Sequence, residues 1–260
     1  MLRNLSRRYK RLRRRGRINF KFGRKFVKVY IGMEAKKSKA ETLAAQYVKD
    51  VEPWRSLSKI CGETYLDLGF ISISTANEFE GRKALCDDCV RVAEIIANAV
   101  PSDIKVESWS YVFDRRIVAI IECDKYNILP IVDSALSDVT FPVTGAHGDL
   151  SNNNVLVSRF SNNFVIIDWE TFRENGSCVE DIIRLLFTDI RSKVDPDKDI
   201  SELAESKVID FYFINRFLSR YQALIVAIIT QATAEIESED VEVVSGRLKR
   251  RFSILEEAIN

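Results

Sequence analysis

The sequence has only one histidine and five cysteines among its 260 residues. Cys86 and Cys89 have the spacing of a metal or redox pair, but no second pair accompanies them and the one histidine, His147, belongs to a different motif. A zinc site needs four such ligands, so we expect these two cysteines to be small core residues on a helix. An odd number of cysteines also argues against a disulfide framework and for a reducing compartment, with the cytosol as the default location.

Long apolar runs are missing as well. The most apolar stretch with helical periodicity, residues 208–229, is interrupted by charged residues at 210, 216 and 220, so we predict no membrane span. Residues 1–28 lack the apolar segment that a signal peptide requires. With 46% hydrophobic and 10% aromatic residues, the chain can nevertheless bury the core of one large domain or of two small lobes.

Acidic residues are absent from the first 28 positions, which hold thirteen Lys and Arg, whereas the remainder carries 26 basic and 38 acidic residues. A basic head therefore precedes an acidic body. Three interpretations of the head stay open: a solvated arm, a segment that binds phosphate groups or an anionic membrane surface, and a nucleic-acid-binding arm. The acidic body argues against an extended nucleic-acid track. The second interpretation would add peripheral binding to the inner face of a membrane.

Alternating apolar and polar residues predict a β-hairpin early in the chain. Its strands would cover residues 18–22 and 26–31, with a turn at the Gly-Arg pair of residues 23–24. Two further short strands are expected at residues 64–66 and 70–74. This part of the chain is therefore predicted to form a small antiparallel sheet.

Lys28 lies inside the second strand of this hairpin, where its ammonium group needs a partner. A helix is expected over residues 39–49, with Ser38 as its N-cap. Glu41 lies close to the apolar side of that helix and is the first candidate partner for Lys28, with Glu34 as a rival. The spacing of Glu41 from Ser38 also fits a capping box, which would be a purely structural role.

Composition and periodicity change near residues 76–81, where we place a lobe boundary. We divide the chain into a basic head (1–15), a first lobe of strands plus one helix (16–80) and a larger, mainly helical second lobe (81–260). Helices of the second lobe are expected at about residues 82–99, 116–123, 128–136, 179–188, 205–233 and 241–259.

The central motif is a run of metal-capable side chains between residues 147 and 170. Asp149 is followed five residues later by Asn154, in a tight loop that leads into a strand, and Asp168 ends the next strand. Few and hard oxygen ligands suit Mg²⁺, which keeps its other positions for water and phosphates. An Asp beside such a site can orient a hydroxyl and accept its proton. A polar turn between a loop and a strand is the structural alternative.

These residues carry a resemblance to the aminoglycoside phosphotransferase and choline kinase family, which are small-molecule kinases. The matching segments are His147-Gly148-Asp149-Leu150 with Asn154, then Ile167-Asp168-Trp169-Glu170, and Gly176 followed by Asp181. The resemblance is strong only over residues 140–185. It implies an α+β, bilobal, protein-kinase-like fold, with a small antiparallel sheet plus one helix in the first lobe and a catalytic loop in the helical lobe.

The resemblance implies an ATP- and Mg²⁺-dependent phosphotransferase that acts on a hydroxyl group of a small molecule, a sugar or an amino alcohol. By matching position, Asp149 would be the catalytic base, and Asn154 and Asp168 would be the magnesium ligands. Given the basic head, the acceptor could be a lipid-linked or lipopolysaccharide-type sugar. Acidic residues of the second lobe, such as Glu170, could bind a cationic acceptor or simply lie at the surface.

The resemblance also assigns supporting residues. Lys28 would hold the α and β phosphates of ATP, with Glu41 as its partner on the helix. His147 would brace the catalytic loop against the metal-binding Asp, and Asp181 would hydrogen-bond that loop. Residues 78–81 would contact the adenine.

One departure from the kinase pattern concerns the phosphates, because the arginine-rich start of the chain offers only Gly16 and Gly23 and no Gly-rich loop. If residues 6–12 form a first strand, the turn Arg13-Arg14-Arg15-Gly16 would grip phosphates by charge. If they form a tail, the phosphate contacts are incomplete. A non-catalytic kinase-like module acting through the basic arm is the alternative function; a protein kinase is disfavoured by Trp169-Glu170, where Phe-Gly would be expected.

Overall fold

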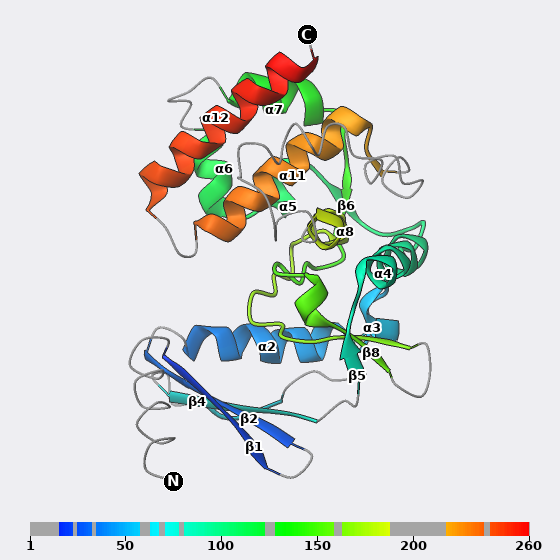
Figure 1. Cartoon of the computed structure of the whole chain (residues 1–260), viewed down its shortest axis with the longest axis vertical. Coiled ribbons are helices and arrows are strands. Elements are labelled where there is room, and N and C mark those ends of the chain that lie inside the picture. The colour runs from blue at the N-terminus through cyan, green and yellow to red at the C-terminus, as the bar shows by residue number, and fades with distance from the viewer. Residues whose placement is uncertain are drawn as a thin grey trace.

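The computed structural model describes residues 16–22, 25–32, 35–57, 63–67, 71–77, 81–122, 128–158, 163–187, 217–236 and 240–259. Figure 1 shows a small sheet with one helix across it at one end of the molecule and a group of helices at the other. The predicted basic head and residues 78–80 of the predicted adenine-contacting segment lie outside the described residues, so the limits of the domains stay predictions.

The first lobe contains the four-stranded antiparallel sheet that the alternating residues predicted. Its strands are β1 (Arg17–Phe22), β2 (Lys25–Ile31), β3 (Glu63–Asp67) and β4 (Ile71–Asn77), in the order β1-β2-β4-β3. In the β1-β2 hairpin, Arg17 is paired with Tyr30 and Asn19 with Lys28. Because cross-strand partners share a face and alternate residues of a strand do too, Arg17, Lys28 and Tyr30 lie on one face of the sheet.

Helix α2 (Ala35–Tyr47) covers the sheet through contacts with β2, β3 and β4. It begins four residues earlier than predicted, so the prediction of Ser38 as N-cap is wrong: Ser38 lies inside the helix. The stretch Ala35-Lys36-Lys37 consists of good helix formers, which lets the helix extend past the serine. Glu41 therefore lies in mid-helix, and the capping-box role for it is also wrong.

The second lobe begins with a strand of a second sheet. Strand β5 (Gly81–Lys83) pairs with β8 (Val155–Ser158), and β8 pairs with β9 (Phe164–Ile166). The helix predicted from residue 82 is therefore wrong in its first turn, and helix α4 (Cys86–Asn98) starts after the strand. Pairing with a distant strand outweighs local helix propensity here. In Figure 1, β5 and β8 lie between the first sheet and the terminal helices.

The second lobe is mainly helical, as predicted. Its remaining elements, with α3 from the segment before the boundary, are α3 (Trp54–Leu57), β6 (Val106–Glu107), α5 (Trp109–Val112), α6 (Arg115–Glu122), α7 (Leu129–Leu136), β7 (Phe141–Pro142), η2 (Asn152–Asn154), α8 (Cys178–Phe187), α11 (Arg220–Glu235) and α12 (Val241–Ile259). The expected helix over 241–259 is confirmed. None of the helices that the structure describes is long and apolar enough to cross a membrane.

The long helix predicted over residues 205–233 is wrong at residues 218–219, which are not helical. Ser219 caps α11 instead, since its hydroxyl oxygen accepts a hydrogen bond from the Gln222 backbone N–H at 3.3 Å, and its own N–H donates to Gln222 Oε1 at 2.8 Å. This reciprocal pair of hydrogen bonds is a capping box, so α11 begins directly after Ser219. Residues 201–216 lie outside the described residues.

The hydrophobic core runs through the second lobe and reaches the first. Helix α8 packs between α4 and α11, and its apolar residues Ile182, Ile183 and Leu185 are at most 1% exposed. Trp54 of α3 meets Trp169 edge-to-face, with ring centroids 5.3 Å apart. The core thus holds α8 and the segment after β9 in place, and these two segments carry most of the predicted site.

Candidate active site

The loop that carries Asp149, the candidate catalytic loop, begins at a position that only glycine can occupy. Gly148 has φ +80°, and a Cβ there would lie 2.5 Å from the carbonyl oxygen of Thr171. The loop before it is held by a short antiparallel bridge between Ala146 and Arg173. At Gly176 a Cβ would come within 2.3 Å of the Cβ of Ala146. Both motif glycines are therefore explained by close approach of two chain segments.

Asp181, in the first turn of α8, binds the backbone of this loop. Its Oδ2 accepts a hydrogen bond from His147 N at 2.6 Å, and its Oδ1 accepts one from Gly148 N at 2.9 Å. The carboxyl group is fully buried, and burial raises its pKa to about 8, with the neighbouring Glu180 charge adding to the rise. Asp181 thus lies where the resemblance implied a support for the loop.

His147 connects the catalytic loop to the end of β9. Its Nε2 donates to Ile167 O at 2.9 Å, and its Nδ1 accepts from Asp149 N at 3.2 Å, which identifies the Nε2–H tautomer. Its ring packs against Trp169 with centroids 4.6 Å apart. Burial lowers the pKa of this imidazole to about 4. A neutral ring therefore sets the spacing between Asp149 and the segment that carries Asp168.

Asp149, the candidate base, has a half-exposed carboxylate held from two sides. Arg184 of α8 makes an ion pair with its Oδ1 and also donates to Gly148 O at 3.0 Å. Asn154 Nδ2 donates to the Asp149 backbone oxygen at 2.7 Å and lies 3.4 Å from its Oδ2. Sequence reasoning missed Arg184. It lies one helical turn after Asp181, and that spacing could have placed it on the same face of α8.

Lys28 of the first lobe contacts carboxylates of both lobes, and together these side chains form a charged cluster, called here the lysine cluster. Its Nζ hydrogen-bonds Glu41 Oε1 of α2, the partner expected first, and Asp168 Oδ1 at 2.6 Å. It also lies 3.2 Å from Glu170 Oε1. Glu34, the rival partner, lies outside the described residues. The half-buried ammonium is therefore surrounded by carboxylates from both lobes, as a charge in a poorly solvated site requires.

Asp168 adopts a strained conformation at the end of β9. Its φ of +67° is the one positive value recorded for a non-glycine residue in the described part of the chain, a state that costs about 1 kcal/mol or more. Burial alone would raise the pKa of its carboxyl, but the charge and hydrogen bond of Lys28, together with the Arg17 charge, hold that pKa below its ordinary value. Asp168 is thus kept ionised and turned toward the first lobe.

Three further residues complete this cluster and were not predicted to belong to it. Arg17 makes an ion pair with Glu170 and lies 3.9 Å from Asp168 Oδ1. The Tyr30 hydroxyl lies 3.0 Å from Glu170 Oε1 and 3.1 Å from a Glu41 carboxylate oxygen. Burial raises the pKa of Tyr30, so it stays a phenol and a donor. Glu170 is therefore part of the lysine cluster, and at 10% exposure it is not the surface residue that was one of the two alternatives for it.

The carboxylates of this cluster fit a divalent metal ion. Glu41, Asp168 and Glu170 each offer an oxygen, and these three atoms lie within 4.8 Å of one another. Such hard oxygen donors suit Mg²⁺. Asn154, the other predicted ligand, donates hydrogen bonds from its amide nitrogen to Asp149. The side-chain oxygen Oδ1 of Asn154 is therefore the atom that would bind a metal ion. Its backbone oxygen accepts from Ile167 N at 2.9 Å, so it lies beside the segment that carries Asp168.

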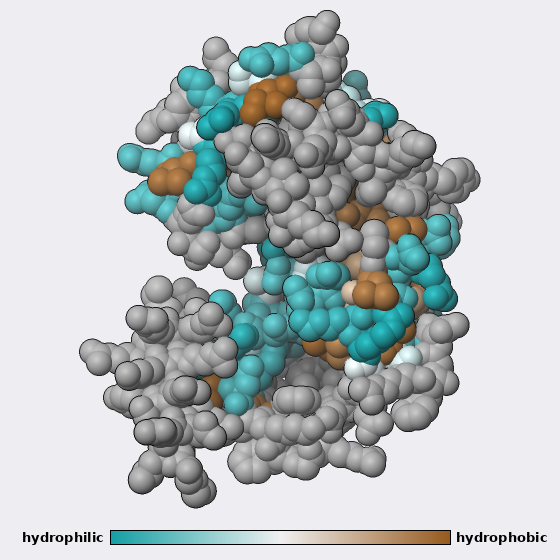
Figure 2. All heavy atoms as spheres, in the orientation of Figure 1, coloured by the Kyte–Doolittle hydropathy of each residue, from teal (hydrophilic) through white to brown (hydrophobic). Residues whose placement is uncertain are grey.

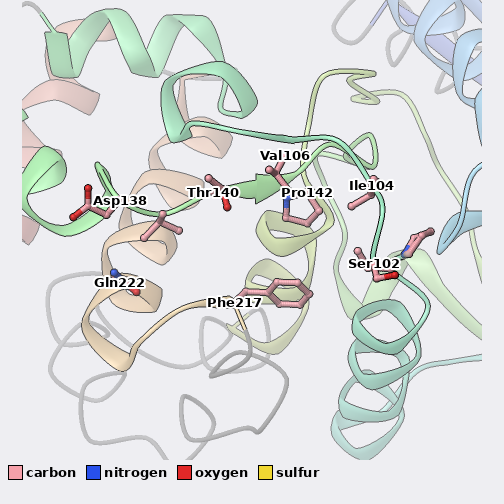
Figure 3. A pocket seen from close by; sticks show the side chains of 11 residues that line it. Ser102, Ile104, Val106, Asp138, Thr140, Pro142, Phe217 and Gln222 are labelled. Atoms are coloured by element: carbon pink, nitrogen blue, oxygen red, sulfur yellow. The ribbon is translucent and has the colours of Figure 1, made fainter.

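In Figure 2, the coloured residues at the inner end of the recess between the two lobes are mostly hydrophilic. A different hollow, of about 500 Å³, lies in the second lobe between β6, β7 and the start of α11 (Figure 3). Val106, Pro142, Phe217 and Gln222 are among its lining residues. It contains none of the predicted site residues, and nothing in it points to phosphoryl transfer.

No protein-family model and no curated protein sequence matches the chain. Solved structures do. The choline kinase LicA from Streptococcus pneumoniae is 17% identical, with 93% of this chain and 90% of that chain covered and a TM-score of 0.54. A choline/ethanolamine kinase family protein from Mesorhizobium loti has 13% identity, coverages of 94% and 87%, and a TM-score of 0.49. An aminoglycoside phosphotransferase from Alicyclobacillus acidocaldarius has 11% identity, coverages of 93% and 88%, and a TM-score of 0.46.

The likeness to the pneumococcal choline kinase spans nearly the whole of both chains. It confirms the predicted fold, an α+β, bilobal, protein-kinase-like architecture with a small antiparallel sheet and a larger helical lobe. At 17% identity it establishes the fold and leaves the chemistry to be argued from the site itself.

Proposed function

We propose that this chain is an ATP- and Mg²⁺-dependent phosphotransferase that moves the γ-phosphate of ATP to a hydroxyl group of a small molecule. One observation carries the proposal. Lys28 of the first lobe contacts Asp168 of the second at 2.6 Å, and His147 joins the segment before Asp168 to the loop that presents the half-exposed Asp149. The side chains proposed to bind phosphate, to bind the metal and to act as base are thus linked by a chain of hydrogen bonds and ion pairs, which supports the proposal.

Each side chain would have a distinct task in this reaction. Lys28, anchored by Glu41, would bind the α and β phosphates of ATP. Mg²⁺ held by Asp168 and Asn154 would supply positive charge for the transferred phosphate. Asp149 would orient the acceptor hydroxyl and take its proton as the new O–P bond forms and ADP leaves with the bridging oxygen. Positioning and electrostatics dominate catalysis in such transfers, so the fixed geometry of the loop is the main contribution of the protein.

The central test is an ATP-consumption assay run against a panel of sugars, aminoglycosides and amino alcohols. We expect Asp149→Ala and Asp168→Ala to abolish acceptor-dependent turnover while the circular dichroism spectrum is unchanged, because both carboxylates act on the reacting groups. Asp103→Ala, at an exposed position far from the motif, is the matched control and should keep wild-type turnover. Unchanged turnover in either site variant would sink the assignment. ATP binding without turnover on any acceptor would favour the non-catalytic alternative.

For the acceptor we propose a sugar or an amino alcohol, and the basic head favours one that is anionic or attached to a membrane lipid. The support is charge alone: thirteen basic and no acidic residues in positions 1–28. A cytosolic protein that binds the inner face of a membrane would fit this charge. Flotation with anionic liposomes should decrease when residues 1–15 are removed, and equal flotation of the two chains would count against the idea.

A further inference from the structure

Arg17 reaches the carboxylate cluster from the first residue of β1. Arg17 is paired with Tyr30 across the hairpin, which places it on the sheet face that carries Lys28. Gly16, the residue before Arg17, is held by a backbone hydrogen bond in which Ile31 N donates to Gly16 O at 2.7 Å. Its guanidinium makes an ion pair with Glu170 and lies 3.9 Å from Asp168 Oδ1. The side chain is 27% exposed, so it is the more solvated of the two cations in the cluster, compared with 16% for Lys28.

The charges of the cluster show why a second cation is present. Three carboxylates, from Glu41, Asp168 and Glu170, lie close together, and Lys28 neutralises only one charge. Glu170 is 10% exposed, and its Oε1 faces Arg17, Lys28 and the Tyr30 hydroxyl. Without Arg17, two uncompensated negative charges would remain in a poorly solvated site, which is unfavourable.

Arg17 faces two of the three carboxylates that fit a metal ion, Asp168 and Glu170. A guanidinium and a divalent cation are both positively charged and repel each other when they bind the same carboxylates. Arg17 and a metal ion therefore compete for Asp168 and Glu170. Lys28 is better anchored than Arg17, because it also hydrogen-bonds the buried Glu41 of α2. Arg17 is therefore the cation that can be displaced.

We propose that Arg17 is an internal counter-ion of this site, which a divalent cation displaces from Asp168 and Glu170 and which then binds the phosphates of the nucleotide. This inference rests on the proposed function, because it needs a metal and a nucleotide at the cluster. Once released, the guanidinium lies beside Lys28 and is suited to bind the phosphates, since the planar arrangement of its N–H donors matches the geometry of phosphate oxygens. It also supplies phosphate contacts in a lobe that lacks a Gly-rich loop.

The proposal predicts opposite effects on two ligands, and neither measurement needs the acceptor. Mn²⁺ titrated in the absence of nucleotide, with free Mn²⁺ followed by electron paramagnetic resonance, should bind Arg17→Met about tenfold more tightly than the wild type, because a competing charge is gone. ATP in saturating Mg²⁺ should bind the same variant about tenfold more weakly, because a charge-assisted phosphate contact is lost. AMP, which lacks the β and γ phosphates, should be affected less.

Two further variants serve as controls. Arg17→Lys keeps the charge and should bind Mn²⁺ with nearly wild-type affinity, which also guards against a methionine variant that folds poorly. Arg55→Met removes an exposed arginine that pairs with Glu52 on the same segment and should change neither affinity. A merely structural role for Arg17 would weaken both ligands together.

Equal or weaker Mn²⁺ binding by Arg17→Met would overturn the proposal. Asp168→Asn separates this failure from failure of the proposed function. If Asp168→Asn loses Mn²⁺ while Arg17→Met binds it as the wild type does, the metal site stands and only the role of Arg17 is wrong. If Asp168→Asn binds Mn²⁺ as tightly as the wild type, the metal is elsewhere and both proposals fail.

Discussion

His147 is the one histidine of the chain, and its environment allows a single protonation state. The buried ring donates through Nε2 to Ile167 O and accepts at Nδ1 from Asp149 N. A proton on Nδ1 would face the Asp149 N–H and would break that contact. The residue therefore acts as a spacer of defined polarity between the candidate base and the candidate metal ligand, and proton transfer is not its task.

The lowered pKa of His147 predicts a loss of stability in mild acid. Its pKa falls from the ordinary 6.5 to about 4 in the folded chain, so the stabilisation is present above pH 6.5 and is lost as the pH falls toward 4. The full loss is about 3 kcal/mol. Urea unfolding of the wild type and of His147→Gln at pH 7 and pH 5 should show a smaller decrease for the variant.

The contribution of Asp181 to stability has the opposite pH dependence. Because the wild type and His147→Gln both contain Asp181, this contribution cancels when their pH dependences are compared. The pKa of Asp181 is raised from 3.8 to about 8, so its stabilisation is lost as the pH rises through that range. Because the chain has one imidazole, its NMR signals give a direct check. They should keep the neutral Nε2–H pattern at pH 5.5; a ring that titrates near 6.5 would contradict the buried, neutral state.

At the scale of the element, α8 holds the candidate catalytic loop through two residues one turn apart. Asp181 accepts from the backbone N–H groups of His147 and Gly148, and Arg184 binds Gly148 O and the Asp149 carboxylate. The apolar residues on the rest of α8 pack against α4 and α11. The position of Asp149, the candidate base, is thus set by a helix that is itself fixed in the core, which favours precise placement.

This arrangement predicts that Arg184 acts as a positioning residue. Arg184→Met should lower kcat by about a hundredfold, because a small displacement of a catalytic group has effects of that size. The KM for ATP should change little, since Arg184 lies at the base and not at the lysine cluster. Arg184→Lys should restore part of kcat by keeping a cation beside Asp149. An effect confined to the KM for ATP would contradict the positioning role.

At the scale of the whole molecule, the described contacts between the lobes include a cluster of ionic side chains. Arg17, Lys28 and Tyr30 of the sheet meet Asp168 and Glu170 of the second lobe. Any ligand of this cluster therefore also bridges the lobes. Nucleotide binding and the relative stability of the two lobes should be coupled for that reason.

The coupling predicts a thermal shift that depends on both lobes. Mg²⁺ with ATP at about a hundred times its dissociation constant should stabilise the wild type by about 2.7 kcal/mol. Lys28→Met removes the first-lobe phosphate contact and Asp168→Ala the second-lobe metal ligand, and either change should abolish most of the shift in a melting experiment. Arg55→Met should keep it. A full shift in Asp168→Ala would mean that the nucleotide binds elsewhere.

Much of the framework followed from local patterns in the sequence. The hairpin of β1 and β2 follows from strict alternation, and α12 follows from a long amphipathic repeat, so both were predicted. Strand β5 could not be predicted from its three residues, because it exists only through pairing with β8, more than seventy residues later. The start of α11 has a local cause instead, since Ser219 and Gln222 form a capping box within a stretch whose apolar residues otherwise follow a continuous helical pattern.

The sequence by itself determined the chemical types at the site: a carboxylate and an amide five residues apart, a second carboxylate after the next strand, and a lysine in an early strand. These lie in short segments whose spacing already limits their geometry. Only the tertiary structure decided that Arg17, Tyr30 and Glu170 share one cluster and that Arg184 holds Asp149. Arg17 and Glu170 are separated by 153 positions, and their contact depends on how the two lobes pack, which no local periodicity encodes.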